Sequence, residues 1–126
     1  MGKLRIKRFG GVYGIAQMSH LERIPDWVDG EGFVYITRTD DELSLVCLED
    51  RIPPDVKVDR DWVCFKFLGP FAFGDAGVLQ SVIQPLSENG IGKFVVSTFD
   101  GDIILLKETD VEVGEQVLME AGHSIV

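Results

Sequence analysis

The second half of the chain has the clearest pattern of hydrophobic and polar positions. In the stretch DAGVLQSVIQPLSENG, apolar residues recur at helical spacing at Leu79, Val82, Ile83 and Leu86. Asp75 is a suitable N-cap, and Gly90 can take the left-handed conformation that ends a helix. Pro85 lies inside the pattern and predicts a kink, because proline removes a backbone hydrogen bond. We therefore predict a kinked helix over residues 75–90.

A hairpin is predicted directly after this helix. Residues 94–99 have the composition of a strand, Asp100-Gly101 that of a two-residue turn, and residues 102–107 that of the returning strand. The run from Ile103 to Leu106 is apolar without a break. We expect helices to cover this returning strand on at least one face.

A second helix and two further strands complete the predicted fold. Thr109 and Glu112 have the spacing of a capping box. The apolar stripe that follows consists of Val113, Val117, Leu118 and Ala121, and it ends at Gly122. The last residues, HSIV, form a short terminal strand, and residues 62–68 form a strand before the first helix. The order β-α-β-β-α-β predicts an α+β, ferredoxin-like fold, with an antiparallel sheet and both helices on one face.

The first half repeats part of this pattern. Two segments have the same order of features, namely a strand, an acidic turn, a second strand and then acidic residues. They are FVYITRTDDELSLVCLED and FVVSTFDGDIILLKETD, in which Phe33 aligns with Phe94. The copy is incomplete, because only a short helix fits around residues 25–28 and the segment RIPPDVKVDRD is Pro-rich. KLRIKRF is a further strand. We predict an abbreviated repeat over residues 1–60 and a complete one over residues 61–126.

Composition and charge limit the classes of partner. The 126 residues, 45% hydrophobic, are enough for one core or for two small ones. The net charge of −9 opposes binding to nucleic acid or to anionic lipids, and the basic residues are not gathered in one stripe of the sequence. The longest apolar runs are about five residues, far below a membrane span, and no signal peptide is recognisable. We expect a cytoplasmic protein with no nucleic-acid or membrane partner.

The residues that usually carry catalysis or bind metals form no motif. Cys47 and Cys64 lie in apolar runs without a CxxC partner, which favours two reduced, buried thiols. His20 and His123 are far apart in sequence and have no ligand partner at fixed spacing. Because no catalytic triad or dyad is recognisable, we predict that the protein is not an enzyme and has no cofactor or metal.

Two short motifs resemble those of the ACT domain family. Asp75-Ala76-Gly77-Val78-Leu79 is similar to the loop that starts the first ACT helix, and Glu88-Asn89-Gly90-Ile91 to the exit of that helix. The run SVIQPLSENGI with VVSTFDGDIILLKE, and YITRTDDELSLVC in the first half, resemble the tandem ACT subfamily, which includes CASTOR-like and small bacterial proteins. The resemblance covers the whole chain from Leu4. It implies tandem ACT domains that act as a regulatory module without enzymatic activity.

The resemblance also implies a ligand site. ACT domains bind small ligands, most often amino acids, at an interface between two ACT units. Carried onto this chain, one side of the site consists of Phe73, Asp75, Ala76, Gly77 and Val78. The other side consists of Asn89, Gly90, Ile91, Gly92 and Lys93, with Thr37 and Arg38 of the first repeat closing the site. A helix N-terminus suits a carboxylate, and nearby carboxylates such as Asp100 and Asp102 suit an ammonium or guanidinium group.

Simpler interpretations stay open for several of these residues. Asp75 as an N-cap needs no ligand, a solvated lysine is the preferred interpretation of Lys93, and a solvated turn is the simplest interpretation of Asp40 to Glu42. The alternative function is a ligand-free module for dimerisation or for binding a regulated partner protein. GKFVVSTF is faintly similar to a strand of RNA-recognition domains, but its residue order and the acidic chain argue against that function.

Overall fold

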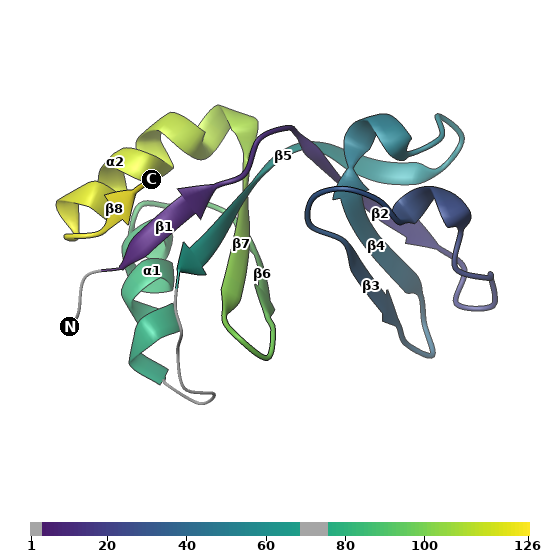
Figure 1. Ribbon diagram of the computed structural model, residues 1–126, viewed down its shortest axis with the longest axis horizontal. Coiled ribbons are helices and arrows are strands. Elements are labelled where there is room, and N and C mark those ends of the chain that lie inside the picture. The colour runs from purple at the N-terminus through teal and green to yellow at the C-terminus, as the bar shows by residue number, and fades with distance from the viewer. Residues whose placement is uncertain (1–3, 69–75) are drawn as a thin grey trace. The chain divides into compact units, whose positions relative to one another are not determined.

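The computed structural model describes residues 4–68 and 76–126 and divides into two compact units (Figure 1). The smaller unit comprises residues 11–62, and the larger unit comprises residues 1–10 together with 63–126. Strand β5 (Lys57–Leu68) contributes its first half to the smaller unit and its second half to the larger one. The border between the two units in β5 follows Trp62. Residues 1–10, which we predicted in the first repeat, belong to the larger unit instead.

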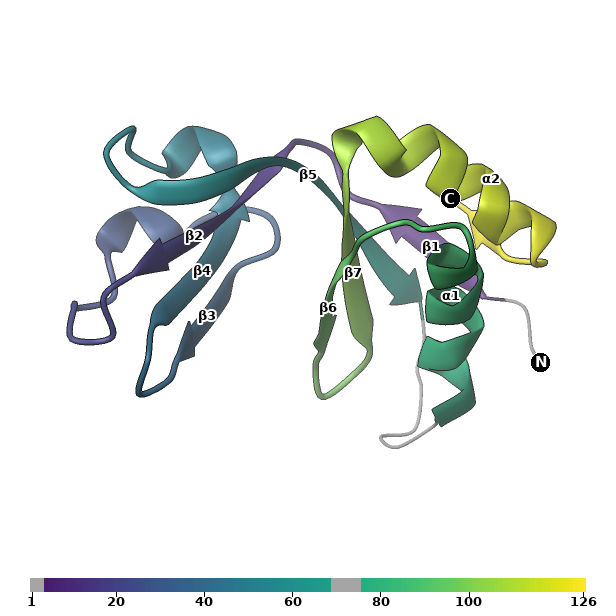
Figure 2. The same cartoon turned by 180° about the vertical axis from the view of Figure 1, so that it is seen from behind.

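In the larger unit, two helices cover one face of a five-stranded sheet (Figures 1 and 2). The strand order is β8-β1-β5-β7-β6. The elements are β1 (Arg5–Arg8), α1 (Ala76–Glu88), β6 (Phe94–Ser97), β7 (Asp102–Lys107), η3 (Glu108–Asp110), α2 (Val111–Glu120) and β8 (Ser124–Ile125). Strand β1 joins this unit because it pairs antiparallel with the second half of β5 and parallel with β8. From β5 onward the predicted ferredoxin-like order is confirmed.

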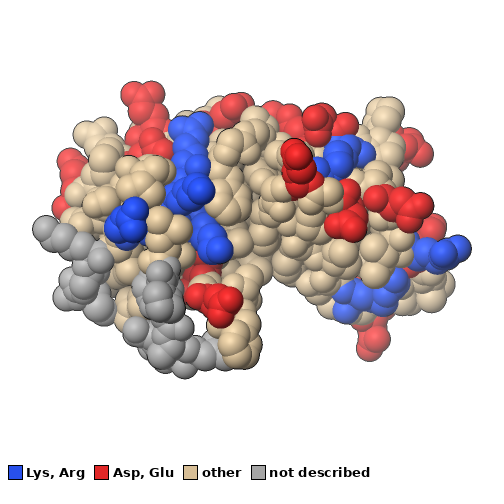
Figure 3. All heavy atoms as spheres, viewed as in Figure 1, with Lys and Arg blue, Asp and Glu red and all other residues tan. Residues whose placement is uncertain are grey.

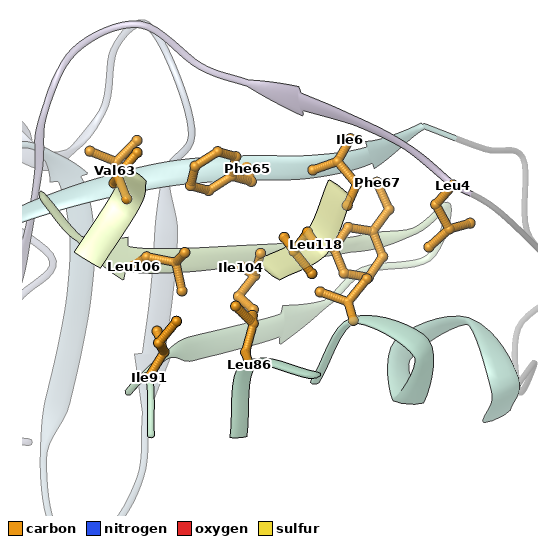
Figure 4. Close-up of a cluster of buried hydrophobic side chains, with 12 residues drawn as sticks. Leu4, Ile6, Val63, Phe65, Phe67, Leu86, Ile91, Ile104, Leu106 and Leu118 are labelled. Atoms are coloured by element: carbon orange, nitrogen blue, oxygen red, sulfur yellow. The ribbon is translucent and has the colours of Figure 1, made fainter. Parts of the chain in front are cut away.

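The core of the larger unit lies between the sheet and the helices (Figure 4). Strands β5 and β7 supply Phe65, Phe67, Ile104 and Leu106, which point toward Leu86 of α1 and Leu118 of α2. All four residues of the apolar run from Ile103 to Leu106 are buried. Because side chains alternate along a strand, β7 is buried on both of its faces, as its unbroken apolar run indicates.

The first helix ends as predicted, whereas the second begins differently. Gly90 has a φ of +70°, and the N–H of Ile91 donates to the carbonyl of Leu86 (3.0 Å), which closes α1 in a Schellman arrangement. Helix α2 starts at Val111 after a 3₁₀ turn, and no side chain caps it, so the predicted capping box is wrong. The buried residues of α2 are Val111, Gly114 and Leu118, while Val113 is 54% exposed.

The turn between β6 and β7 is longer than predicted. Ser97 pairs with Asp102, so the loop contains four residues, 98–101, and not only Asp100-Gly101. The N–H of Thr98 donates to the carbonyl of Gly101 (2.7 Å), and the N–H of Gly101 donates to the hydroxyl of Thr98 (3.2 Å). The threonine hydroxyl therefore stabilises a wider turn than the Asp-Gly pair alone would form.

The smaller unit is a four-stranded sheet with the order β3-β4-β2-β5. Its elements are β2 (Tyr13–Met18), η1 (Asp26–Val28), β3 (Tyr35–Arg38), β4 (Leu43–Leu48), η2 (Glu49–Arg51) and the first half of β5. The short helix predicted around residues 25–28 is confirmed as the 3₁₀ turn η1. The buried core consists of Ala16, Val28, Leu43, Leu45, Cys47 and Ile52.

The turn between β3 and β4 has the same construction as the turn between β6 and β7. The N–H of Thr39 donates to the carbonyl of Glu42 (2.9 Å), and the N–H of Glu42 donates to the hydroxyl of Thr39 (3.2 Å). The two turns therefore align Thr39 with Thr98. Under this alignment Tyr35, and not Phe33, corresponds to Phe94, and the similarity of the hairpins supports an internal duplication.

Candidate functional site

The structure does not gather the predicted ligand residues of the larger unit in one place. Phe73 and Asp75 lie outside the described residues. Ala76, Gly77 and Val78 form the first turn of α1, whereas Asn89 to Lys93 follow its last turn. At about 1.5 Å per residue, the 13-residue helix α1 is about 20 Å long, and the two groups lie at its opposite ends. Thr37 and Arg38 lie on β3 of the smaller unit, where Arg38 donates to the carbonyl of His20.

The segment Asn89–Lys93, which we call the α1–β6 loop, has an open surface. A Cβ atom added to Gly90 or to Gly92 would meet no described atom within 4 Å beyond the two neighbouring residues. Gly90 needs its glycine for the positive φ that ends α1, but Gly92 has no such backbone requirement. Within the described part of the chain, Gly92 also makes no hydrogen bond. The loop therefore offers exposed backbone at which a small molecule can approach closely.

Two polar side chains flank these glycines. The Lys93 ammonium donates to the carbonyl of Ile91 (3.2 Å) and is half-buried, so it is held against the loop and is not a freely solvated lysine. The Asn89 amide donates to the carbonyl of Pro85 (2.8 Å), which leaves its own carbonyl oxygen as an acceptor. The loop thus combines a cation and a neutral acceptor, which are the groups that bind the two ends of an amino acid.

The predicted acidic partners lie elsewhere in the larger unit. Asp100 belongs to the β6–β7 turn, and Asp102 begins β7, at the opposite end of β6 from the α1–β6 loop (Figure 1). The Asp102 carboxylate accepts a hydrogen bond from the hydroxyl of Ser97 (2.5 Å) across the hairpin. Neither carboxylate is therefore placed to bind the ammonium group of a ligand at the loop.

His123 has a role that the sequence pattern did not indicate. It is only 6% exposed, and its Nδ1 accepts a hydrogen bond from the N–H of Leu4 (3.1 Å). The tautomer that accepts at Nδ1 carries its proton on Nε2, which donates to the carbonyl of Ser81 (2.9 Å). In a regular helix that carbonyl would accept from residue 85, but Pro85 has no N–H. The histidine therefore replaces the helical hydrogen bond that the proline removes, and it links α1 to the residues that directly precede β1 and β8.

A cavity of about 380 Å³ lies over this histidine. Its lining residues are Gln80, Ser81, Gln84, Pro85, Glu88, Ala121 and His123. Both ring nitrogens of His123 already have backbone partners, and Gln80, Gln84 and Glu88 hydrogen-bond one another along the helix surface. Because both ring nitrogens are used within the protein, we infer that His123 stabilises the fold and does not bind a ligand.

Neither cysteine is suited to act as a nucleophile. Both thiols are free and buried. Burial raises the pKa of Cys64 to about 12, and burial also raises the pKa of Cys47, where the neighbouring Arg51 guanidinium opposes part of the shift. A cluster of metal ligands or a membrane-spanning helix would also bear on the function. In residues 4–68 and 76–126, no three His, Cys, Asp or Glu side chains are grouped as metal ligands. No helix in these two ranges is long and apolar enough to cross a membrane.

The pKa of Cys64 predicts how stability changes at alkaline pH. The thiol ionises near pH 9.0 in the unfolded chain but only near pH 12 in the folded one. Its contribution to folding is therefore complete below pH 9.0 and decreases as the pH rises toward 12, by up to about 1.4 kcal/mol per pH unit. Urea unfolding measured between pH 9 and pH 12 should show that the free energy of unfolding falls less steeply with pH for Cys64→Ala than for the natural protein. Equal slopes for the two proteins would contradict the assignment.

Family models match both parts of the chain. A model described as an ACT domain matches residues 57–120, and one described as an N-terminal domain matches residues 11–55. Among solved structures, a protein from Agobacterium tumefaciens is 59% identical, with a TM-score of 0.96 over 100% of this chain and 94% of that chain. A search of proteins with curated descriptions finds no match.

More distant solved structures share the fold. A Vibrio cholerae protein described as a possible transport protein is 16% identical, with a TM-score of 0.76 over 94% of this chain and 90% of that chain. The ligand-free regulatory subunit of aspartate kinase from Thermus thermophilus is 8% identical, with a TM-score of 0.60 over 89% of this chain and 93% of that chain. The ACT domain match includes β5, both helices and the α1–β6 loop. This chain therefore belongs to the ACT domain family.

Proposed function

We propose that this protein is a non-enzymatic regulatory module, located in the cytoplasm, that binds a small ligand, an amino acid, at the α1–β6 loop. The observation that carries the proposal is the open, unbonded backbone at Gly92, inside the segment that matches the ACT domain model. The fold is shared with the regulatory subunit of an aspartate kinase, which supports a regulatory role. That the ligand binds between two ACT repeats stays a prediction from the family resemblance.

The chemistry of the loop suits the head group of an amino acid. The free N–H of Gly92 and the Lys93 ammonium can donate to a carboxylate, because only one of the three ammonium hydrogens is used by Ile91. The unused carbonyl oxygen of Asn89 can accept from the amino group. Since none of these groups would contact the ligand side chain, we expect the loop to bind the carboxylate and amino groups that all amino acids have. Other residues would then select the amino acid.

A substitution at Gly92 tests the site without disturbing the fold. Valine at this position fills empty space and requires no positive φ, so we expect its free energy of unfolding to change by less than about 1 kcal/mol. The same side chain covers the exposed backbone. In a thermal-shift screen of the twenty amino acids, at least one compound should raise the melting temperature of the natural protein, and Gly92→Val should lose that increase.

Gly10→Val is the matched control, because Gly10 is equally open, has no positive φ and lies outside the loop. This variant should keep the ligand-induced increase. A flat screen across all twenty amino acids would remove the support for ligand binding and would leave the ligand-free interaction module as the better account. An increase that Gly92→Val retains would place the ligand away from the loop.

A further inference from the structure

Three basic side chains gather on the open face of the larger unit. Lys7 of β1 lies directly opposite Lys66 of β5 in the antiparallel pairing, and Arg5 is two residues along the same face. Their neighbours Ile6 and Phe67 point into the core on the helix side, so this basic face is the one that α1 and α2 leave uncovered. All three side chains are exposed. Figure 3 shows Lys and Arg side chains over β1 and β5.

In the described part of the chain, no carboxylate forms an ion pair with this basic face. Like charges directly opposite one another on a sheet are destabilising. Arg8 forms an ion pair with Glu115 (3.7 Å), whereas in residues 4–68 and 76–126 no such pair is found for Arg5, Lys7 or Lys66. Lys7 and Lys66 are far apart along the chain, so no local pattern indicates this cluster.

The strongest concentration of opposite charge is in the smaller unit, which contains twelve acidic and five basic residues and so has a net charge of −7. Three of the carboxylates are consecutive in the β3–β4 turn, at Asp40, Asp41 and Glu42, which we call the acidic turn. The hydroxyl of Thr39 accepts from the backbone N–H groups of Asp41 and Glu42 and so fixes the turn. Asp40 and Asp41 are exposed, and neither carboxylate has a bonded partner in the described chain.

We propose that the acidic turn of one copy of this chain docks on the basic face of a second copy. The two surfaces have opposite charge, and the charges of Lys7 and Lys66 are close together because residues opposite each other in a sheet are only about 5 Å apart. A narrow hairpin tip can also approach a flat sheet face. The interaction is independent of the amino-acid ligand and of the α1–β6 loop.

Exchange of the charges tests this contact. Sedimentation velocity at about 0.1 mM protein should show self-association of the natural chain that weakens at least about tenfold between about 0.1 M and about 1 M salt, because salt screens exposed charges. The double variant Lys7→Glu, Lys66→Glu and the double variant Asp40→Lys, Asp41→Lys should each associate about tenfold more weakly. An equimolar mixture of the two variants should associate again.

The matched control is Arg23→Glu, Lys57→Glu, which makes the same change in charge at exposed positions outside both surfaces and should associate like the natural protein. A natural protein that is monomeric at both salt concentrations would overturn the proposal, as would a mixture that fails to associate. Binding of a single-stranded RNA by a monomeric natural protein, lost in Lys7→Glu, Lys66→Glu, would overturn it too and would assign the basic face to nucleic acid.

Discussion

Replacement of His123 by alanine is expected to lower the free energy of unfolding of the larger unit by about 3 kcal/mol. The variant leaves the N–H of Leu4 and the carbonyl of Ser81 without their partners and opens a cavity between β8 and α1. Helix α1 and helix α2 both belong to the larger unit, whereas both tryptophans, Trp27 and Trp62, belong to the smaller one. The unfolding transition that helical circular dichroism follows should therefore move to a lower urea concentration. The transition that tryptophan fluorescence follows should move less.

A double-mutant cycle with Pro85 separates the specific hydrogen bond from general loss of packing. In Pro85→Ala, the new backbone N–H can donate to the carbonyl of Ser81, so this carbonyl no longer depends on the histidine. The cost of His123→Ala should then be about 1 kcal/mol smaller in the Pro85→Ala background. Equal costs in the two backgrounds would show that His123 does not replace the missing helical bond.

The second large effect is expected at Gly114 of α2. A Cβ atom at this position would lie 2.8 Å from the Cδ1 atom of Leu106, which is fully buried and has little room to move. Although valine is a better helix former than glycine, the overpacking should dominate, and we expect Gly114→Val to lower the free energy of unfolding by about 3 kcal/mol. Urea unfolding followed by helical circular dichroism measures this change.

Gln116→Val is the control for the Gly114 variant, because it introduces the same side chain at an exposed position of α2. Its effect should stay within about 0.5 kcal/mol. If Gly114→Val were as stable as Gln116→Val, the result would contradict the close packing of Gly114 in α2 against Leu106 in β7.

Local patterns were sufficient to predict the helix that ends at Gly90, the strand at Asp102–Lys107 and the order of elements after β5. These features depend on neighbouring residues, such as the positive φ of a glycine or an unbroken apolar run. The family resemblance predicted the α1–β6 loop as a candidate site. The structure adds that Gly92 is open there and that Lys93 is held by the carbonyl of Ile91.

Features that depend on distant residues could not be predicted in the same way. His123 contacts Leu4 across nearly the whole length of the chain, and a single histidine in HSIV has no pattern that indicates this. The place of β1 in the larger unit depends on its pairing with β5 and β8. The turn at residues 98–101 was predicted two residues too short, because the Asp-Gly pair is a strong signal and the role of the Thr98 hydroxyl was not considered.

The central claim is that an amino acid binds at the α1–β6 loop, and nuclear magnetic resonance of the ¹⁵N-labelled protein tests it most directly. Each amino acid that raises the melting temperature is titrated while the backbone amide signals are followed. We predict that the signals of Gly90, Gly92 and Lys93 shift in a saturable way and that Gly92→Val abolishes these shifts. Saturable shifts confined to other residues, or no shifts with any amino acid, would contradict the account.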